Sequence, residues 1–234
     1  MTKIIENLEY LRKYPVFDSL TAGDKLDKNR GYTNLFLHRL AKRKLIRRIE
    51  KNKYTLFDDP FLIASRIVWP SYISCWNALS YHKLTEQVPS DIWVVATKSK
   101  KYIKFDSTKI RFVKIKTNCF FGYDKVRYQN SDAFIANPEK AIIDSFLLRK
   151  ISFSEVKEII FANIKRIKTR KFIDYLIKIG NHSLIKRFGF LFETIGKDYY
   201  NALKRHIDAV YIPLDYSKKP IGKKNEKWRL IINA

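Results

Sequence analysis

The sequence predicts an α+β protein: an N-terminal winged helix-turn-helix followed by a mixed α/β C-terminal domain rich in helices. Apolar residues recur at helical spacing through residues 4–44, and two short segments rich in β-branched and aromatic residues follow them. Beyond residue 60 the chain mixes β-rich segments with longer helical ones. We place the domain boundary at residues 58–60, so that a DNA-binding domain covers residues 1–58 and a C-terminal domain covers residues 59–234.

The expected N-terminal domain has three helices and a hairpin. The first helix ends before Tyr14 and Pro15, and Ser19 is the expected cap of the second. A turn at residues 27–31 separates the second helix from the third. The expected helices cover residues 4–11, 20–26 and 32–44, and the expected strands cover residues 45–49 and 53–57.

The C-terminal domain is expected to begin with helices and strands in alternation and to become mainly helical. The helices expected early in it cover residues 61–68 and 75–81, and the strands cover residues 92–97, 110–115 and 132–136. Helical patterns dominate residues 138–206, and two more strands are expected at residues 209–213 and 228–232. Residues 217–227 are expected to form a charged loop.

Composition argues against an enzyme, a metal protein and a membrane protein. Two cysteines make neither a disulfide framework nor a metal site, and no apolar run approaches the roughly 18 residues of a membrane helix. The N-terminus meets charge at once, so we expect a cytoplasmic protein. The glutamate–lysine pattern at Glu155 and Lys157 is similar to part of a nuclease motif, but it lies in an expected capped helix. We therefore expect no catalytic residue, no cofactor and no metal.

The charge of the chain is strongly positive, with 47 basic and 23 acidic residues and a formal net charge of +24. By region, the net charge is +7 over residues 1–58, +5 over residues 59–145 and +12 over residues 146–234. This excess predicts attraction to polyanions. We expect a basic surface in the C-terminal part, which either continues a DNA track or meets another anionic partner. Its expected members are Arg166, Lys168, Arg170, Lys171, Lys186 and Arg187.

The third helix is the expected recognition helix, whose N-terminal half meets base edges in the major groove. Arginine suits guanine and asparagine suits adenine, while lysines further along meet phosphates. Each of three residues has an alternative to DNA contact. Tyr32 could pack on the second helix, His38 could be exposed without a binding role, and Lys42 could lie on a solvated face. The expected DNA-binding residues are Arg30, Tyr32, Thr33, Asn34, His38, Arg39 and Lys42 on the helix, and Arg47, Arg48, Lys51 and Lys53 on the wing.

Three segments carry a family resemblance. Residues 69–89, WPSYISCWNALSYHKLTEQVP, contain an aromatic-Ile-Ser start, an Ala-Leu pair and a His-Lys-Leu-Thr-Glu-Gln turn. Residues 136–144 read ANPEKAIID, and residues 183–193 read SLIKRFGFLFE. In this order after a winged helix, the segments resemble the AbiEi family of antitoxins. The family usually has glycine where this chain has Lys83.

The resemblance implies a role and partners. AbiEi proteins repress their own operon by binding double-stranded operator DNA, and they counteract a nucleotidyltransferase toxin, AbiEii, directly or indirectly, often in phage defence. The oligomeric state stays open, a monomer included, and no membrane partner is expected. The alternative is an RNA- or tRNA-binding module without a toxin partner, which would bind through the basic C-terminal part.

The motif residues also have structural interpretations. Pro138 suits the first turn of a helix, and Lys140 and Asp144, four residues apart, are placed to pair. Ser183 is the expected cap of a later helix, and Gly189 is expected to permit close packing. Lys186 and Arg187 either face phosphate or pair with Glu193 and its neighbours. The phenylalanines of the third segment are expected in the core.

Overall fold

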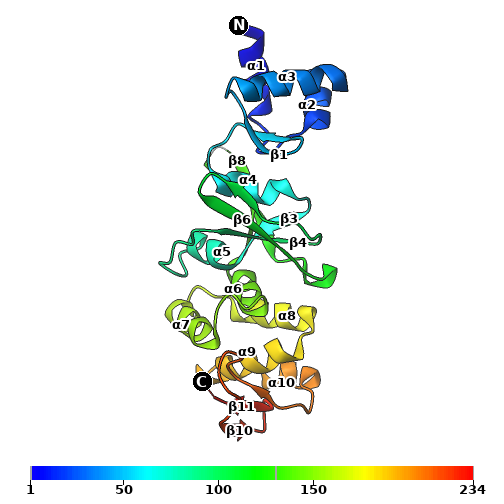
Figure 1. Cartoon of the computed structure of the whole chain (residues 1–234). Coiled ribbons are helices and arrows are strands. Elements are labelled where there is room, and N and C mark those ends of the chain that lie inside the picture. The colour runs from blue at the N-terminus through cyan, green and yellow to red at the C-terminus, as the bar shows by residue number, and fades with distance from the viewer. Residues whose placement is uncertain (1, 130, 234) are drawn as a thin grey trace. The chain divides into compact units, whose positions relative to one another are not determined.

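The computed structural model describes residues 2–129 and 131–233, so Met1, Asn130 and Ala234 lie outside it (Figure 1). The fold is mixed α+β. The chain divides into two compact units, each built from separate stretches of sequence. The first unit comprises residues 1–73, 89–115 and 124–135, and the second comprises residues 74–88, 116–123 and 136–234. Within the described ranges, no helix combines the length and the apolar character needed to cross a membrane.

The first unit begins with three helices and an antiparallel hairpin. The helices are α1 (Thr2–Leu11), α2 (Ser19–Leu26) and α3 (Arg30–Lys42), and the hairpin strands are β1 (Arg47–Glu50) and β2 (Lys53–Thr55). Leu11, Ala22 and Leu37, one from each helix, meet in one buried cluster. The α1–α2 linker joins the hairpin, because Phe17 and Tyr54 exchange two backbone hydrogen bonds of 3.0 and 2.9 Å.

A six-stranded sheet follows in the order β5-β6-β4-β3-β8-β7. Strand β4 is parallel to β6 and antiparallel to β3, and β3 is parallel to β8. Helix α4 (Pro60–Ile67) leads into β3 and packs on the sheet. The strands are β3 (Ser71–Ile73), β4 (Ile92–Ala96), β5 (Ile103–Phe105), β6 (Thr108–Lys114), β7 (Tyr123–Tyr128) and β8 (Ser131–Ala136).

The second unit is mainly helical and ends in a small sheet. Three phenylalanines, Phe172, Phe188 and Phe192, are buried together, with ring centroids 4.8 and 5.1 Å from that of Phe172. The small sheet has the order β10-β11-β9. The helices are α5 (Cys75–Tyr81), η1 (Thr117–Cys119), α6 (Pro138–Leu147), α7 (Phe153–Asn163), α8 (Thr169–Ile179), α9 (His182–Thr194), α10 (Tyr200–Leu203) and η2 (Lys204–His206). The strands are β9 (Ile212–Pro213), β10 (Lys223–Asn225) and β11 (Leu230–Ile232).

The expected elements are largely confirmed, with two corrected helix caps. Asp18, not Ser19, caps α2, since its carboxylate accepts from the Thr21 N–H. Asn181, not Ser183, caps α9, because the helix begins two residues earlier than expected. Ser152 and Glu155 form a complete capping box on α7, so the helix expected there is confirmed.

Four strands were not expected, and the expected domain boundary stays a prediction. Strands β3 and β5 have three residues each, too few for an alternating pattern, and β7 and β10 are rich in polar residues. Strand β10 lies in what was expected to be a charged loop. Residue 58 marks the end of the segment that follows the hairpin, but residues 59–73 belong to the same compact unit as residues 1–58.

Candidate nucleic-acid interface

Helices α2 and α3 are joined by a three-residue turn that brings them close together. Asp27 adopts a left-handed conformation with φ 52°, and Asn29 caps α3 by accepting the Tyr32 N–H at 2.9 Å. A Cβ placed on Gly23 would lie 3.0 Å from the Lys28 carbonyl oxygen and 3.2 Å from Thr33 Oγ1. Glycine at position 23 therefore permits the close approach of α2 to the start of α3.

Helix α3 turns one side to the core and the other to solvent. Leu37 and Leu40 are buried on one side of the helix, whereas the side chains on the opposite side are exposed. Asn29 satisfies a donor at the helix start, so the exposed first turn can meet a ligand without fraying. Six of the expected DNA-binding residues share this exposure: Arg30, Tyr32, Asn34, His38, Arg39 and Lys42.

Thr33 is a correction to the expected set. It is only 1% exposed, and its hydroxyl donates to the Asn29 carbonyl at 2.9 Å, so it belongs to the helix interface. Tyr32 is 53% exposed and stacks on Phe36, one turn further along, with ring centroids 6.1 Å apart. Sequence reasoning missed Leu35, which is 48% exposed on the outer side and suits contact with a thymine methyl group. A helical projection of residues 30–42 would have found it.

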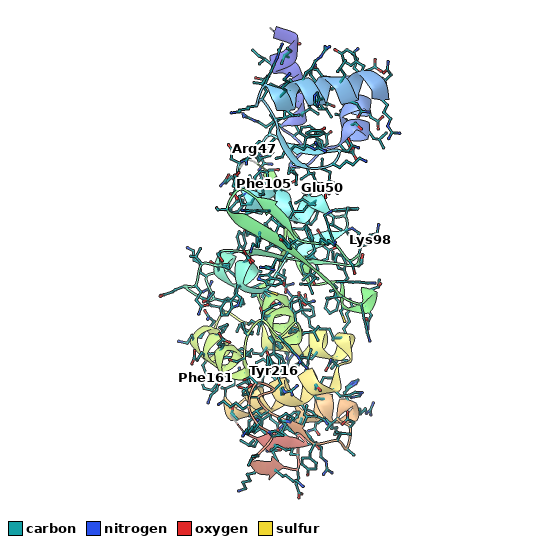
Figure 2. The ribbon with its side chains drawn as sticks, viewed as in Figure 1. Arg47, Glu50, Lys98, Phe105, Phe161 and Tyr216 are labelled. Carbon is teal, nitrogen blue, oxygen red and sulfur yellow. The ribbon has the colours of Figure 1, made fainter. Side chains whose placement is uncertain are left out.

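Two expected wing contacts, Arg47 and Lys53, are engaged within the first unit. The Arg47 guanidinium pairs with Asp58 at 3.0 Å and with Asp106, and it lies 4.1 Å from the centroid of the Phe105 ring (Figure 2). The hydrogen bond that Arg47 donates to Asp106 raises the pKa of Arg47. Lys53 pairs with Glu50 at 3.0 Å and donates to the Ile67 carbonyl. These two side chains fasten the hairpin to neighbouring segments, and we no longer assign them to DNA.

Glu50 is the second anchor of the hairpin. Lys100 donates to it at 2.7 Å, in addition to Lys53. Burial acts to raise the pKa of Glu50, but the hydrogen bonds from both lysines hold that pKa below its ordinary value. Arg48 and Lys51 are exposed, and Arg48 Nε donates to the Glu50 carbonyl at 3.2 Å. The wing therefore presents Arg48 and Lys51 as its outward cations.

The expected C-terminal basic surface loses two members. Lys186 is 1% exposed, and its ammonium donates at 2.5 Å to Asp208 and to the Val210 carbonyl. Arg187 is 8% exposed and donates to the carbonyls of Pro213 and Leu214 at 2.8 and 2.9 Å. Burial lowers the pKa of Arg187. Both side chains hold the segment after η2 against α9, so neither faces a ligand, and Glu193 is not their partner.

The other four expected members lie around the start of α8, with different environments. Arg166 is exposed but donates to the carbonyls of His82 and Lys83 at 2.6 and 2.8 Å, where α5 ends. Lys171 pairs with the buried Glu139 at 3.3 Å, and although burial acts to lower its pKa, this carboxylate raises it. Lys168 and Arg170 are exposed. Lys168 and Arg170 are therefore the basic side chains here best placed to meet an anion.

The first two motif segments meet in the second unit. Lys140 and Asp144 form the expected pair, and both side chains are fully buried. Ser74 Oγ donates to the other carboxylate oxygen of Asp144 at 2.8 Å. A ring nitrogen of His82 lies 2.8 Å from the Ala136 carbonyl oxygen. These motif residues thus hold α5 against α6, and full burial leaves Lys140 and Asp144 no access to a ligand.

The third motif segment holds Trp228. Gly189 leaves room for the Trp228 ring, which a Cβ at position 189 would overlap. Glu193 accepts the indole N–H of Trp228 and also pairs with Lys227. Close packing was expected at Gly189 between helices, but the neighbour is the Trp228 ring, which lies outside the helices. Phe188 and Phe192 are in the core as expected, and Phe190 is half-buried.

The fold and its motif contacts can be compared with known proteins. No family model matches the chain, and no curated protein matches it at a significant level.

Proposed function

We propose that the chain is a DNA-binding autorepressor and antitoxin of the AbiEi type, and that its first three helices and hairpin form a winged helix-turn-helix. The observation that carries the proposal is the exposure of polar side chains along α3, Arg30, Asn34 and Lys42 among them, on a helix that is capped and packed on α2. This is the arrangement by which a recognition helix enters the major groove. Arg30 and Asn34 supply base readout, and Lys42 with Lys51 supplies phosphate contacts.

Three further features support a winged helix. The turn between α2 and α3 has the length found in helix-turn-helix motifs. The hairpin follows α3 directly, and the Phe17 bridge adds a third segment beside β2. The cluster of apolar residues shared by the helices and the hairpin gives residues 2–56 a core of their own. A separate core suits a module that docks on DNA as a rigid body.

The antitoxin half of the proposal rests on the motif resemblance. The structure gives one position of that resemblance a physical meaning: Lys83, where the family usually has glycine, has a φ of 55°. This left-handed conformation is the one that favours glycine, so the backbone has the turn that the family residue would adopt. We propose that the C-terminal part counteracts a nucleotidyltransferase toxin encoded beside it.

A full-length Arg30→Ala/Asn34→Ala variant separates the two roles. If each side chain makes a bidentate base contact, the double change should weaken binding to the operon's own promoter by about 2–6 kcal/mol. Binding to scrambled duplex should fall less, and rescue of cells from the toxin should persist. Fluorescence anisotropy with both duplexes measures the first effect, and growth during toxin co-expression measures the second.

Two matched variants control this experiment. Lys51→Ser removes a wing cation and should weaken binding to both duplexes alike. Lys218→Ser removes an exposed lysine of the second unit and should leave binding to both duplexes unchanged. Equal loss on promoter and scrambled DNA in the double variant would remove Arg30 and Asn34 from base readout. Loss of toxin rescue in a folded double variant would contradict the division of roles.

A further inference from the structure

The basic excess in the middle of the chain is confined to one end of the six-stranded sheet. Residues 59–145 carry 13 basic and 8 acidic side chains, and residues 91–114 alone carry 7 and 2 of them. The remainder of the region therefore has 6 basic and 6 acidic residues and is neutral. Residues 91–114 form β4, β5 and β6, with β4 and β6 side by side (Figure 1).

Aromatic and basic side chains form a row across these strands. Trp93 and Arg111 are register partners on β4 and β6, so their side chains share a face of the sheet. The Arg111 guanidinium lies 5.5 Å from the centroid of the Trp93 ring and 5.8 Å from that of Tyr102. Asp91 holds Arg111 from the side with a 2.5 Å ion pair. Tyr102 itself is 58% exposed, so its ring is available to a ligand.

A second row, beside the first, carries two lysines. Lys104 and Lys109 are register partners on β5 and β6, and both are exposed. Like charges directly opposite each other destabilise a sheet, so an anion between them would relieve a cost that the folded chain carries. Lys109 Nζ is 6.0 Å from the Tyr102 ring centroid, which places this charge next to the aromatic row. Lys98 and Lys101, in the loop between β4 and β5, are also exposed, and Figure 2 labels Lys98.

We propose that this face of β4, β5 and β6 binds single-stranded nucleic acid. Unpaired bases stack on Tyr102 and Trp93, with the Arg111 guanidinium between the two rings, and the phosphates lie along Lys104 and Lys109. Two strand spacings, about 10 Å, separate the two aromatic residues, and Arg111 occupies the interval between them, so each ring stacks on a different base. Single strands are bound by this combination of aromatic rings with a basic track, because every base has a face that can stack.

Base stacking decides against the other polyanions. In a duplex the base faces are covered by their neighbours, so Tyr102 and Trp93 would have no partner there. An acidic protein surface would meet the lysines but would make no use of the aromatic row. The proposal adds to the duplex site on α3 a separate site of different specificity, and it does not depend on the autorepressor role.

Fluorescence anisotropy of the full-length protein with a labelled 12-mer of oligouridylate tests the proposal. The wild type should bind this probe, and Tyr102→Ala should weaken binding by roughly 5- to 150-fold, the range for loss of one stacked base. Tyr102→Phe keeps the ring and should retain most of the affinity. Lys104→Ser/Lys109→Ser should lower the slope of log K against log salt by about 1.4, since a single strand contributes about 0.7 per neutralised phosphate.

Two controls make the result specific. Lys218→Ser/Lys219→Ser removes the same charge from exposed positions of the second unit and should leave the slope unchanged. Duplex DNA of equal length should bind Tyr102→Ala as well as it binds the wild type. No binding of the 12-mer by the wild type, or wild-type affinity in a folded Tyr102→Ala variant, would overturn the proposal. So would an equal fall in slope in the two lysine pairs.

Discussion

The buried pair of Lys140 and Asp144 gives a prediction that the structure makes quantitative. Both side chains are fully buried, and Ser74 adds a 2.8 Å hydrogen bond to the carboxylate. Removing one partner leaves the other charge in a site with no water to solvate it, which costs about 3–5 kcal/mol. Lys140→Met should therefore lower the free energy of unfolding by that amount, and for a chain of this size lower the melting temperature by roughly 6–20 °C.

A double variant separates the pair from its surroundings. Lys140→Met/Asp144→Leu removes both charges and fills the site with apolar atoms, leaving the Ser74 hydroxyl without its carboxylate acceptor at a cost of about 1–3 kcal/mol. The double change should thus be much less destabilising than the sum of the single ones. Lys125→Met is the matched control, because Lys125 pairs with Asp132 at 3.2 Å on the surface and should contribute only about 0–1 kcal/mol.

Urea denaturation followed by circular dichroism measures these free energies, with the slope of each transition compared between variants. If Lys140→Met lowers the free energy of unfolding no more than Lys125→Met does, burial does not make the Lys140–Asp144 pair stronger than a surface pair. If the double variant costs the sum of the two single ones, the two side chains do not interact, and the reasoning from their contact fails.

Two other predictions concern packing and pH. Gly189→Ala should displace the Trp228 ring and destabilise the chain by about 1–3 kcal/mol, which thermal unfolding and a shift in tryptophan emission would show; an unchanged melting temperature would mean that the ring has room. Glu50 has a folded-state pKa below its ordinary value of 4.5, so its contribution to stability is present above that value and is lost as the pH falls through the folded-state pKa. Glu50→Gln should therefore be destabilising at neutral pH and should flatten the dependence of stability on pH below about 4.5, and an unaltered pH profile would contradict this assignment.

Local features of the fold could be predicted from the sequence, because they depend on residues close together in the chain. The capping box of Ser152, the Pro138 helix start and the Lys140–Asp144 pair each need at most four residues of separation. The ion-pair partners of the basic side chains could not be predicted from the sequence. Arg47 meets Asp106 across 59 residues, and Lys186 meets Asp208 across 22, so only the tertiary fold brings these partners together.

Within the candidate site the limit was the direction in which each side chain points. Thr33 lies between two expected contacts in the sequence, yet it faces α2, because a helix turns about 100° per residue. Leu35 was missed for a different reason, since the expected contacts were chosen among polar and aromatic side chains, although Leu35 is 48% exposed. Thr33 lies four and seven residues before Leu37 and Leu40 and therefore on their side of the helix, whereas Leu35 does not.

The surroundings of each basic side chain are a better guide to binding surfaces than the regional net charge. Residues 146–234 have the largest excess, +12, but Lys186 and Arg187 there are buried, and Lys171 is paired with Glu139. Residues 91–114 have an excess of only +5, but over 24 residues, with several of the lysines exposed on neighbouring strands and aromatic rings beside them. Phosphate contacts require solvent-facing cations at the spacing of a nucleic-acid backbone, and buried cations contribute nothing to them. The sheet end therefore differs from the C-terminal region in the aromatic rings that lie beside its basic side chains, and not in the number of its charges.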